Sequence, residues 1–142
     1  MRAVLDTNVL ISATLIRGGN EDRILRAWQR GAFELVLSRA TLAELGRALF
    51  YEKLRRKRWV SEEEARLLLE LLAAECILVP GKVAVKASRD PQDDMFLAAA
   101  VEGEAEYVVS GDKDLLSVGA YRGIEIVSPA GFVRILREAE NG

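Results

Sequence analysis

Short apolar runs alternate along the chain with longer segments in which apolar residues recur at helical spacing. The runs are Ala3–Leu5, Phe33–Leu37, Cys76–Val79, Tyr107–Val109 and Ile124–Val127. Each run has the length and composition of a buried strand. Strands that alternate with helices pair in parallel and are covered by helices on both faces. The pattern therefore predicts an α/β fold, a three-layer α/β/α domain around a central parallel sheet of about five strands.

Residues that favour helix starts mark where several of the intervening helices begin. Ser38 is a candidate N-cap after the second strand, and the stretch Ser61–Glu64 has the S-x-x-E form of a capping box. Asp90 and Pro91 form the pair expected at an N-cap and the first helical position. The segment 95–101 that follows is almost wholly apolar, so we expect this helix to be buried.

The length and composition of the chain exclude several classes of protein. At 142 residues we expect a single domain over residues 1–138 with a short tail, 139–142. The sequence contains no histidine and one cysteine, Cys76, which excludes Cys/His zinc sites and Ser-His or Cys-His nucleophile pairs. No apolar run approaches the ~18 residues of a membrane span. We therefore expect a soluble, cytoplasmic protein.

The net charge of −2 conceals an uneven distribution of charge. Residues 1–60 carry 12 basic and 6 acidic side chains, whereas residues 61–142 carry 8 basic and 16 acidic ones. A positive half of this kind favours a polyanionic partner, because net charge acts on association rather than on the fold.

Aspartates are concentrated in three short segments. Six of the seven occupy them: Asp6, Asp90, Asp93, Asp94, Asp112 and Asp114. Asp6 ends the first predicted strand and Asp112 follows the fourth, so both belong to the edge of the sheet where the carboxyl ends of parallel strands meet. The helix after the second strand begins at the same edge, and its spacing places Glu44 beside the apolar face. We expect these three side chains to point toward one another.

The acids around Pro91 have different expected roles. Asp90 as the N-cap and Asp93 in the first turn would satisfy free N–H groups and favour the positive end of the helix dipole. Asp94 shares a helix face with Ala98 and Val101, and an unpaired carboxylate buried there would be costly. Asp94 is therefore expected to need a cation.

Several carboxylates held close together would repel one another unless a cation neutralised them. Asp112 and Asp114 could simply cap the turn at Leu115, and the case for Asp112 rests on its expected meeting with Asp6 and Asp94. With oxygen ligands alone, the expected cation is Mg²⁺ or Mn²⁺. Such ions activate water and stabilise charge on phosphoryl oxygens, so the predicted chemistry is phosphodiester hydrolysis.

Four segments in this order resemble the motifs of PIN-domain nucleases, in particular toxin components of the VapC type. The segments are Val4–Leu10, Leu42–Leu45, Asp93–Ala100 and Val109–Leu116. The resemblance implies an acidic quartet of Asp6, Glu44, Asp94 and Asp112 as catalytic metal ligands. It also implies that Asp114 supports a second metal or its water, and that Asn8 and Ser110 orient the ligands. Asp93 is a further candidate for this orienting role.

The resemblance implies metal-dependent hydrolysis of RNA, with one or two Mg²⁺ or Mn²⁺ ions and an attacking hydroxide produced by the metal. It further implies a small antitoxin protein as a partner. Dimerisation through the broad leucine surface at 67–72 is an additional expectation. The alternative is a PIN-like module that binds RNA or protein with little or no turnover. Phosphatases that form an aspartyl-phosphate are disfavoured, because Asn8 stands where they need a second acid.

A basic run lies between Tyr51 and Trp59. It consists of Lys53, Arg55, Arg56, Lys57 and Arg58. As a functional surface, the run would hold RNA phosphates beside an acidic site. A solvated helix face and a docking surface for the antitoxin are the other two interpretations.

Overall fold

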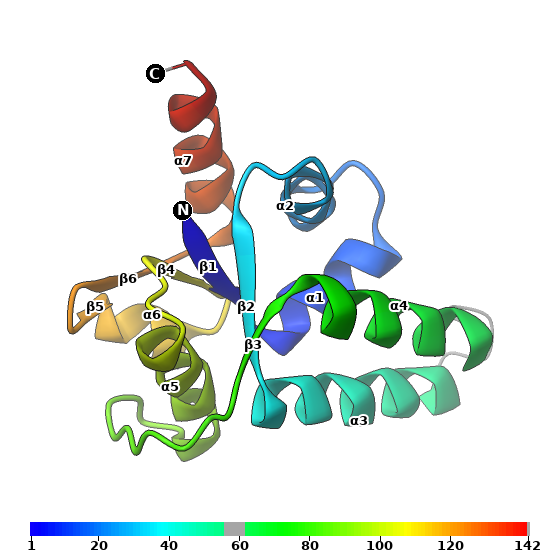
Figure 1. Ribbon diagram of the computed structural model, residues 1–142, viewed down its shortest axis with the longest axis horizontal. Coiled ribbons are helices and arrows are strands. Elements are labelled where there is room, and N and C mark those ends of the chain that lie inside the picture. Colours follow the sequence, from blue (N-terminus) through cyan, green and yellow to red (C-terminus); the bar gives the residue numbers. More distant parts are fainter. Residues whose placement is uncertain (56–61, 142) are drawn as a thin grey trace.

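A computed structural model describes residues 1–55 and 62–141 (Figure 1). The strands are β1 Arg2–Leu5, β2 Glu34–Ser38, β3 Ile77–Val79, β4 Tyr107–Val109, β5 Ala120–Tyr121 and β6 Ile124–Val127. The helices are α1 Thr7–Leu15, α2 Asn20–Gln29, α3 Arg39–Arg55, α4 Glu62–Glu75, α5 Asp94–Glu102, α6 Lys113–Val118 and α7 Pro129–Asn141, with a 3₁₀ turn over Pro91–Asp93 before α5.

The six strands form one sheet in the order β3-β2-β1-β4-β6-β5. All neighbouring strands are parallel except β5 and β6, which are antiparallel. The predicted α/β fold and its five parallel strands are confirmed. The two-residue β5 was not predicted. It pairs with β6 through a tight hairpin turn at Arg122 and Gly123, whose φ angles are 49° and 81°. A strand of two residues is too short to leave a hydrophobic pattern.

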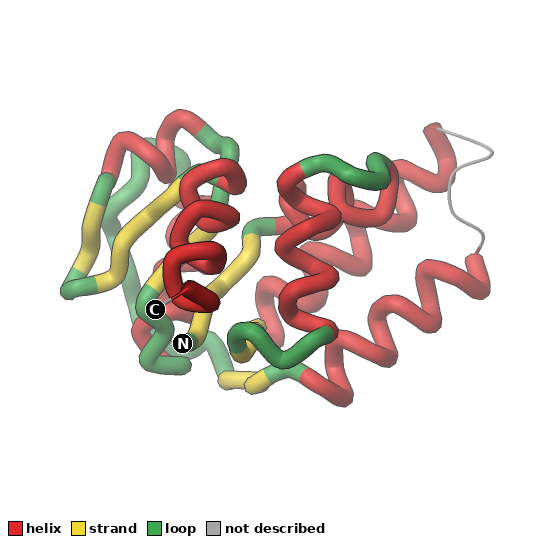
Figure 2. Tube along the Cα trace, turned by 90° about the horizontal axis from the view of Figure 1, so that it is seen from above, coloured by secondary structure: helices red, strands yellow, loops and turns green. Residues whose placement is uncertain are grey.

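Alternation along each strand divides the core into two halves. On β1, Ala3 and Leu5 pack with α1, α2, α3, α4 and α7, whereas Val4 packs on the opposite face with α5 and α6. The same alternation separates Leu35 and Leu37 from Val36 on β2. The sheet is therefore the middle layer of three, as Figure 2 shows from above.

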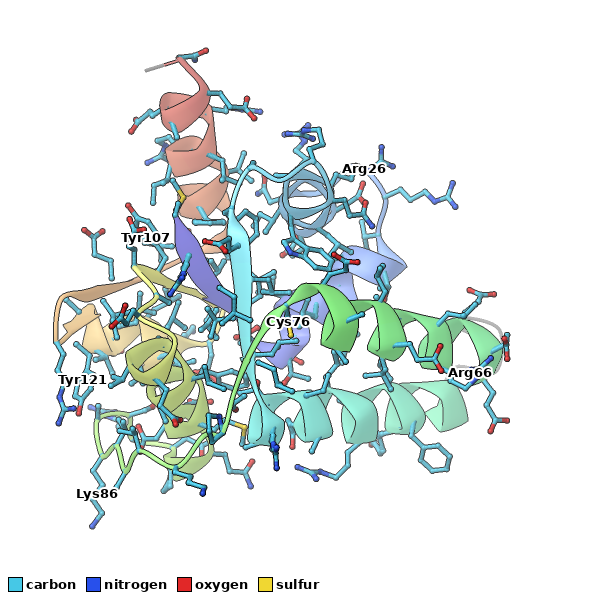
Figure 3. The ribbon with its side chains drawn as sticks, in the orientation of Figure 1. Arg26, Arg66, Cys76, Lys86, Tyr107 and Tyr121 are labelled. Carbon is cyan, nitrogen blue, oxygen red and sulfur yellow. The ribbon has the colours of Figure 1, made fainter. Side chains whose placement is uncertain are left out.

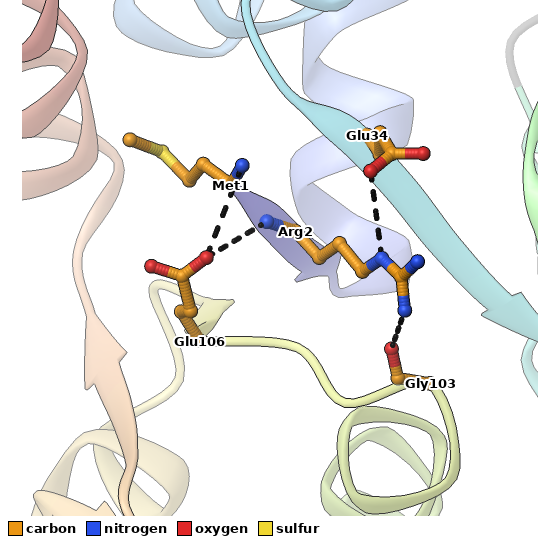
Figure 4. Close-up of polar contacts among 5 residues, drawn as sticks. All are labelled: Met1, Arg2, Glu34, Gly103 and Glu106. Carbon is orange, nitrogen blue, oxygen red and sulfur yellow. Dashed lines mark hydrogen bonds and ion pairs between the residues drawn. The ribbon is translucent and has the colours of Figure 1, made fainter.

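Polar contacts fix the edge of the sheet where β1 and β2 begin (Figure 4). The Arg2 guanidinium donates from Nε to Glu34 at 3.4 Å and from Nη1 to the carbonyl of Gly103 at 3.1 Å. Gly103 ends α5 against β2 so closely that a Cβ there would lie 2.4 Å from Cγ1 of Val36. These contacts set the position of α5, whose other end carries part of the acidic site.

Three helix boundaries differ from the expectations or add to them. α7 continues to Asn141, so the predicted tail at 139–142 is in fact the last turn of a helix up to that residue. Ser61, the predicted cap of α4, lies outside the described residues. After Asp90 the chain forms the 3₁₀ turn before α5 begins at Asp94. Among the described helices, none has both the length and the apolar character needed to cross a membrane.

Candidate metal site

The acidic residues gather where the order of strands reverses between β1 and β4. The backbone N–H of Asp6, just beyond β1, donates to the carbonyl of Val109 at the end of β4 at 3.0 Å. Ligands bind in α/β sheets at such a crevice beyond the carboxyl ends of the strands. A cavity of about 240 Å³ lies here, lined by Asp6, Thr7, Asn8, Glu44, Ala48, Asp90, Gln92, Asp93, Met95, Phe96 and Asp112.

Asp6 is buried, with 4% of its surface exposed, and both carboxylate oxygens are engaged. As the N-cap of α1, its Oδ1 accepts from the backbone N–H of Val9 at 2.8 Å. Its Oδ2 accepts from the hydroxyl of Ser110. Burial raises the pKa of Asp6 above its usual range, and the hydrogen bonds from Ser110 and Val9 oppose this effect.

Ser110 links the ends of the two central strands. While its hydroxyl donates to Asp6, the same oxygen accepts from the backbone N–H of Asp112 at 2.9 Å. Asp112 is the N-cap of α6, and its Oδ1 accepts from the backbone N–H of Asp114 at 2.7 Å. The sequence places Asp6 and Asp112 far apart, and this fully buried serine holds them in one polar network.

Three carboxylates come close enough to share a cation. Asp93, Asp112 and Asp114 each offer an oxygen, and these oxygens lie within 4.8 Å of one another. Burial, followed by the charges of Asp112 and Asp90, raises the pKa of Asp93 from 3.8 to about 6. The hydroxyl of Ser88 donates to Asp93 over a long 3.4 Å and opposes this shift only in part. The negative charge of the three carboxylates is therefore uncompensated.

Asp94 does not lie at the metal cavity, where its shared helix face with Ala98 and Val101 led us to expect it. Its Oδ1 accepts from the backbone N–H groups of Ala87 at 3.1 Å and Ser88 at 2.8 Å. Asp94 is buried, but it neither lines the cavity nor belongs to the group of three carboxylates. Backbone donors therefore satisfy one oxygen of this buried carboxylate. The structure thus brings Asp93 to the cavity, where Asp94 was expected, whereas Asp94 accepts from backbone N–H groups, as was expected of Asp93.

Asp93 and Asp94 stand on either side of a change in helix type, because Asp93 ends the 3₁₀ turn and Asp94 begins α5. With 3.0 residues per turn instead of 3.6, a 3₁₀ turn rotates successive side chains by about 20° more per residue than an α-helix. Over Pro91–Asp93 this difference shifts the phase of α5 relative to the cap at Asp90. Asp90 itself has its expected place, and its Oδ1 accepts from the backbone N–H of Gln92 at 3.0 Å.

The remaining predicted residues lie around the cavity. Glu44 reaches it from α3 while its Oε2 accepts from Arg47 at 3.0 Å, and it is not one of the three clustered carboxylates. Asn8 is exposed and faces both this cavity and an adjoining hollow. The side chains of the basic run at 53–58 lie outside the described part of the chain, as do its residues 56–58 altogether.

Sequence reasoning overlooked Thr7. Its hydroxyl oxygen is buried at the cavity and has no hydrogen-bond partner within the described residues. The available signal was its position directly after Asp6, where the first strand ends. An unpaired buried hydroxyl is costly. Together with donors that are all oxygen atoms, it fits a site that receives a hard divalent cation such as Mg²⁺ or Mn²⁺ and its ligands.

These features define a class of protein. It is an α/β domain that carries a carboxylate cluster where the order of strands reverses. The family model of the PIN domain matches residues 2–114, and the chain belongs to this family. The match includes every acidic residue of the cavity and of the cluster. The predicted family membership is confirmed.

Solved structures that resemble this chain include two that share 90% coverage of it. One is VapBC2 from Rickettsia felis bound to a DNA fragment from their promoter, with 13% identity, a TM-score of 0.58, and coverage of 90% of this chain and 98% of that one. The other is FitAcB from Neisseria gonorrhoeae, with 18% identity, the same coverage and a TM-score of 0.49. At such identities, the first likeness supports the fold alone. No curated protein matches the sequence.

Proposed function

We propose that this protein is a divalent-metal-dependent endoribonuclease whose cation is held by Asp93, Asp112 and Asp114. The observation that carries the proposal is the grouping of these three carboxylates within 4.8 Å at the strand-order reversal of a PIN domain. When bound, the cation supplies an activated water and stabilises charge on the phosphoryl oxygens. Asp6 and Glu44 complete the acidic wall of the cavity.

The chain's own groups have distinct tasks in this proposal. Ser110 holds Asp6 and the backbone of Asp112 in a fixed relation, so that the cluster is pre-organised. The hydroxyl of Thr7 and the amide of Asn8 face the cavity, where they orient a water or a phosphate oxygen. Asp94 acts as a positioning residue, since it ties residues 87 and 88 to the start of α5 beside Asp93.

The substrate and partners follow from the resemblance to VapC-type toxins. We propose RNA as the substrate and a small antitoxin protein as a partner that controls the enzyme. The fold similarity to VapBC2 supports this proposal. On α4, Leu67 and Leu71 remain 51% and 42% exposed, which supports the further proposal that the protein forms a dimer through this helix.

The decisive experiment is cleavage of a mixed-sequence RNA by the purified protein with Mn²⁺, Mg²⁺ or EDTA. We expect metal-dependent cleavage that falls at least about 100-fold in Asp112→Asn and Asp93→Asn, because each variant loses a ligand charge. Asp94→Asn is the comparison variant: it removes the neighbouring charge, but Asp94 is a positioning residue and not a proposed ligand, so cleavage should fall less than in either ligand variant.

Cleavage that survives in both Asp93→Asn and Asp112→Asn would contradict the assignment of these ligands. Cleavage lost in Asp94→Asn but kept in Asp93→Asn would restore the quartet implied by the resemblance. Binding of Mn²⁺ without cleavage of any RNA would replace the nuclease by a PIN-like binding module.

A further inference from the structure

A groove with an excess of positive charge lies between α2 and α7, outside the acidic site. The two helices pack side by side, and the hollow between them has a volume of about 180 Å³. Four arginines line it, Arg23, Arg26, Arg30 and Arg137, and the one acidic residue of the lining is Glu140. Figure 3 labels Arg26 on α2. Apolar side chains of both helices form the rest of its wall.

The spacing of the arginines places them along one stripe of α2. Arg23, Arg26 and Arg30 stand at positions i, i+3 and i+7, which share one side of a helix. The seven residues from Arg23 to Arg30 span about 10 Å.

The positive charge of the groove is only partly neutralised. Arg26 pairs with Asp22 at 3.2 Å, and Arg30 pairs with Glu140 at 3.3 Å. Arg23 and Arg137 form no ion pair with any residue in the described ranges 1–55 and 62–141. Two guanidinium groups are thus available to a ligand, and guanidinium groups match phosphate oxygens in a bidentate geometry.

Helices α2 and α7 begin beside the acidic site, and the groove lies farther along them. A hollow beside the site is lined by Asn8 and Asp112, which also face the metal cavity, and by Glu21 and Pro129 at the starts of α2 and α7. The far ends of the two helices meet through the pair of Arg30 with Glu140. α2 and α7 therefore run in the same direction, away from the acidic site. Glu21, near the start of α2, repels phosphates there, so contacts are expected from Arg23 toward the end of the helix.

We propose that the α2–α7 groove binds the phosphodiester backbone of a single nucleic-acid strand whose neighbouring segment enters the acidic site. The proposal rests on the proposed nuclease function for the identity of the polyanion. Because the acidic site repels a polyanion, the attraction that retains a strand must come from outside it. The groove lies along two helices that begin beside that site, which favours a strand of nucleic acid over an acidic protein segment.

The test measures binding of a fluorescein-labelled single-stranded 20-nucleotide RNA by anisotropy, in EDTA, between 50 and 300 mM salt. The double variant Arg23→Gln/Arg137→Gln removes the two unpaired charges. Its matched control, Arg122→Gln/Arg134→Gln, removes two exposed arginines that do not line the groove. Thermal unfolding checks that both variants remain folded.

We expect the groove variant to bind more weakly and its slope of log K against log salt to be shallower by about 1.4, since each lost phosphate contact in a single strand contributes about 0.7. The control should keep the original slope. Equal slopes in the two variants, no RNA binding by the unaltered protein, or equally effective competition by poly-glutamate would each overturn the proposal.

Binding in EDTA is measured without cleavage, so failure of the groove and failure of the nuclease are distinguishable. If the unaltered protein cleaves RNA but the slopes are equal, the groove proposal alone is refuted. If the slopes differ as expected and no RNA is cleaved with any metal, the groove stands and the nuclease is refuted.

Discussion

Replacing Asp93 by asparagine should stabilise the metal-free protein, although the residue is a proposed ligand. Asp93 is 8% exposed and lies beside Asp112 and Asp114. Burial and these charges raise its pKa from 3.8 to about 6. The folded protein therefore holds the proton more tightly than the unfolded chain does, so ionised Asp93 destabilises the fold. This penalty is full above about pH 6, fades as the pH falls toward 3.8, and is absent below it.

The raised pKa sets the magnitude of the effect. A difference from 3.8 to about 6 corresponds to about 3 kcal/mol of folding free energy. Because the cavity opens to water, which screens the charges, we expect Asp93→Asn to gain about 1–2 kcal/mol at pH 7.5. The gain should shrink to a small fraction at pH 4, close to the pKa of 3.8 in the unfolded chain, and vanish well below that pH, where Asp93 is protonated in both states.

Urea denaturation in EDTA at pH 4, 5, 6 and 7.5 measures this gain directly. The same series is then repeated with Mn²⁺. At neutral pH the order of the two stabilities should reverse, so that the unaltered protein is more stable than Asp93→Asn. Mn²⁺ at 100 times its dissociation constant should stabilise the unaltered protein by about 2.7 kcal/mol, and Asp93→Asn should lose most of this increment. Asp94→Asn is the control: it weakens two charge-assisted hydrogen bonds, should lose stability at pH 7.5, and should still gain stability from Mn²⁺.

Two results would refute this reasoning. One is a metal-free Asp93→Asn variant that is less stable than the unaltered protein at pH 7.5. The other is a change in stability that does not depend on pH. Loss of the Mn²⁺ increment in Asp94→Asn alone would move the ligand role back to Asp94.

Two further substitutions test the packing that supports the site. Gly103→Ala should destabilise the protein by about 1–3 kcal/mol in urea denaturation, because the added Cβ would lie 2.4 Å from Cγ1 of buried Val36. Gly111→Ala, whose Cβ would meet no atom within 4 Å, should change stability far less, and equal losses would contradict this account. Ser110→Ala should cost about 1–3 kcal/mol at pH 7.5, because buried Asp6 loses a donor, and an unchanged urea midpoint would argue against the bridging role.

The architecture followed from the sequence alone, and so did the edge of the sheet where the candidate site lies. Short apolar runs defined the five parallel strands, since a strand that is buried on both faces is apolar at nearly every position. Asp6 and Asp112 follow strands that pair in the centre of the sheet, so their meeting could be predicted from topology. The motifs were sufficient to identify the PIN family, which the family match confirms.

Asp93 and Asp94 are distinguished only by the folded structure. Which of two adjacent carboxylates faces the cavity depends on the 3₁₀ turn before α5 and on the backbone N–H groups of residues 87 and 88. The arginine groove likewise joins Arg23 with Arg137, which no local pattern relates. Strands and caps are specified by interactions a few residues apart, whereas side-chain direction and pairing between distant helices are fixed by packing across the whole domain.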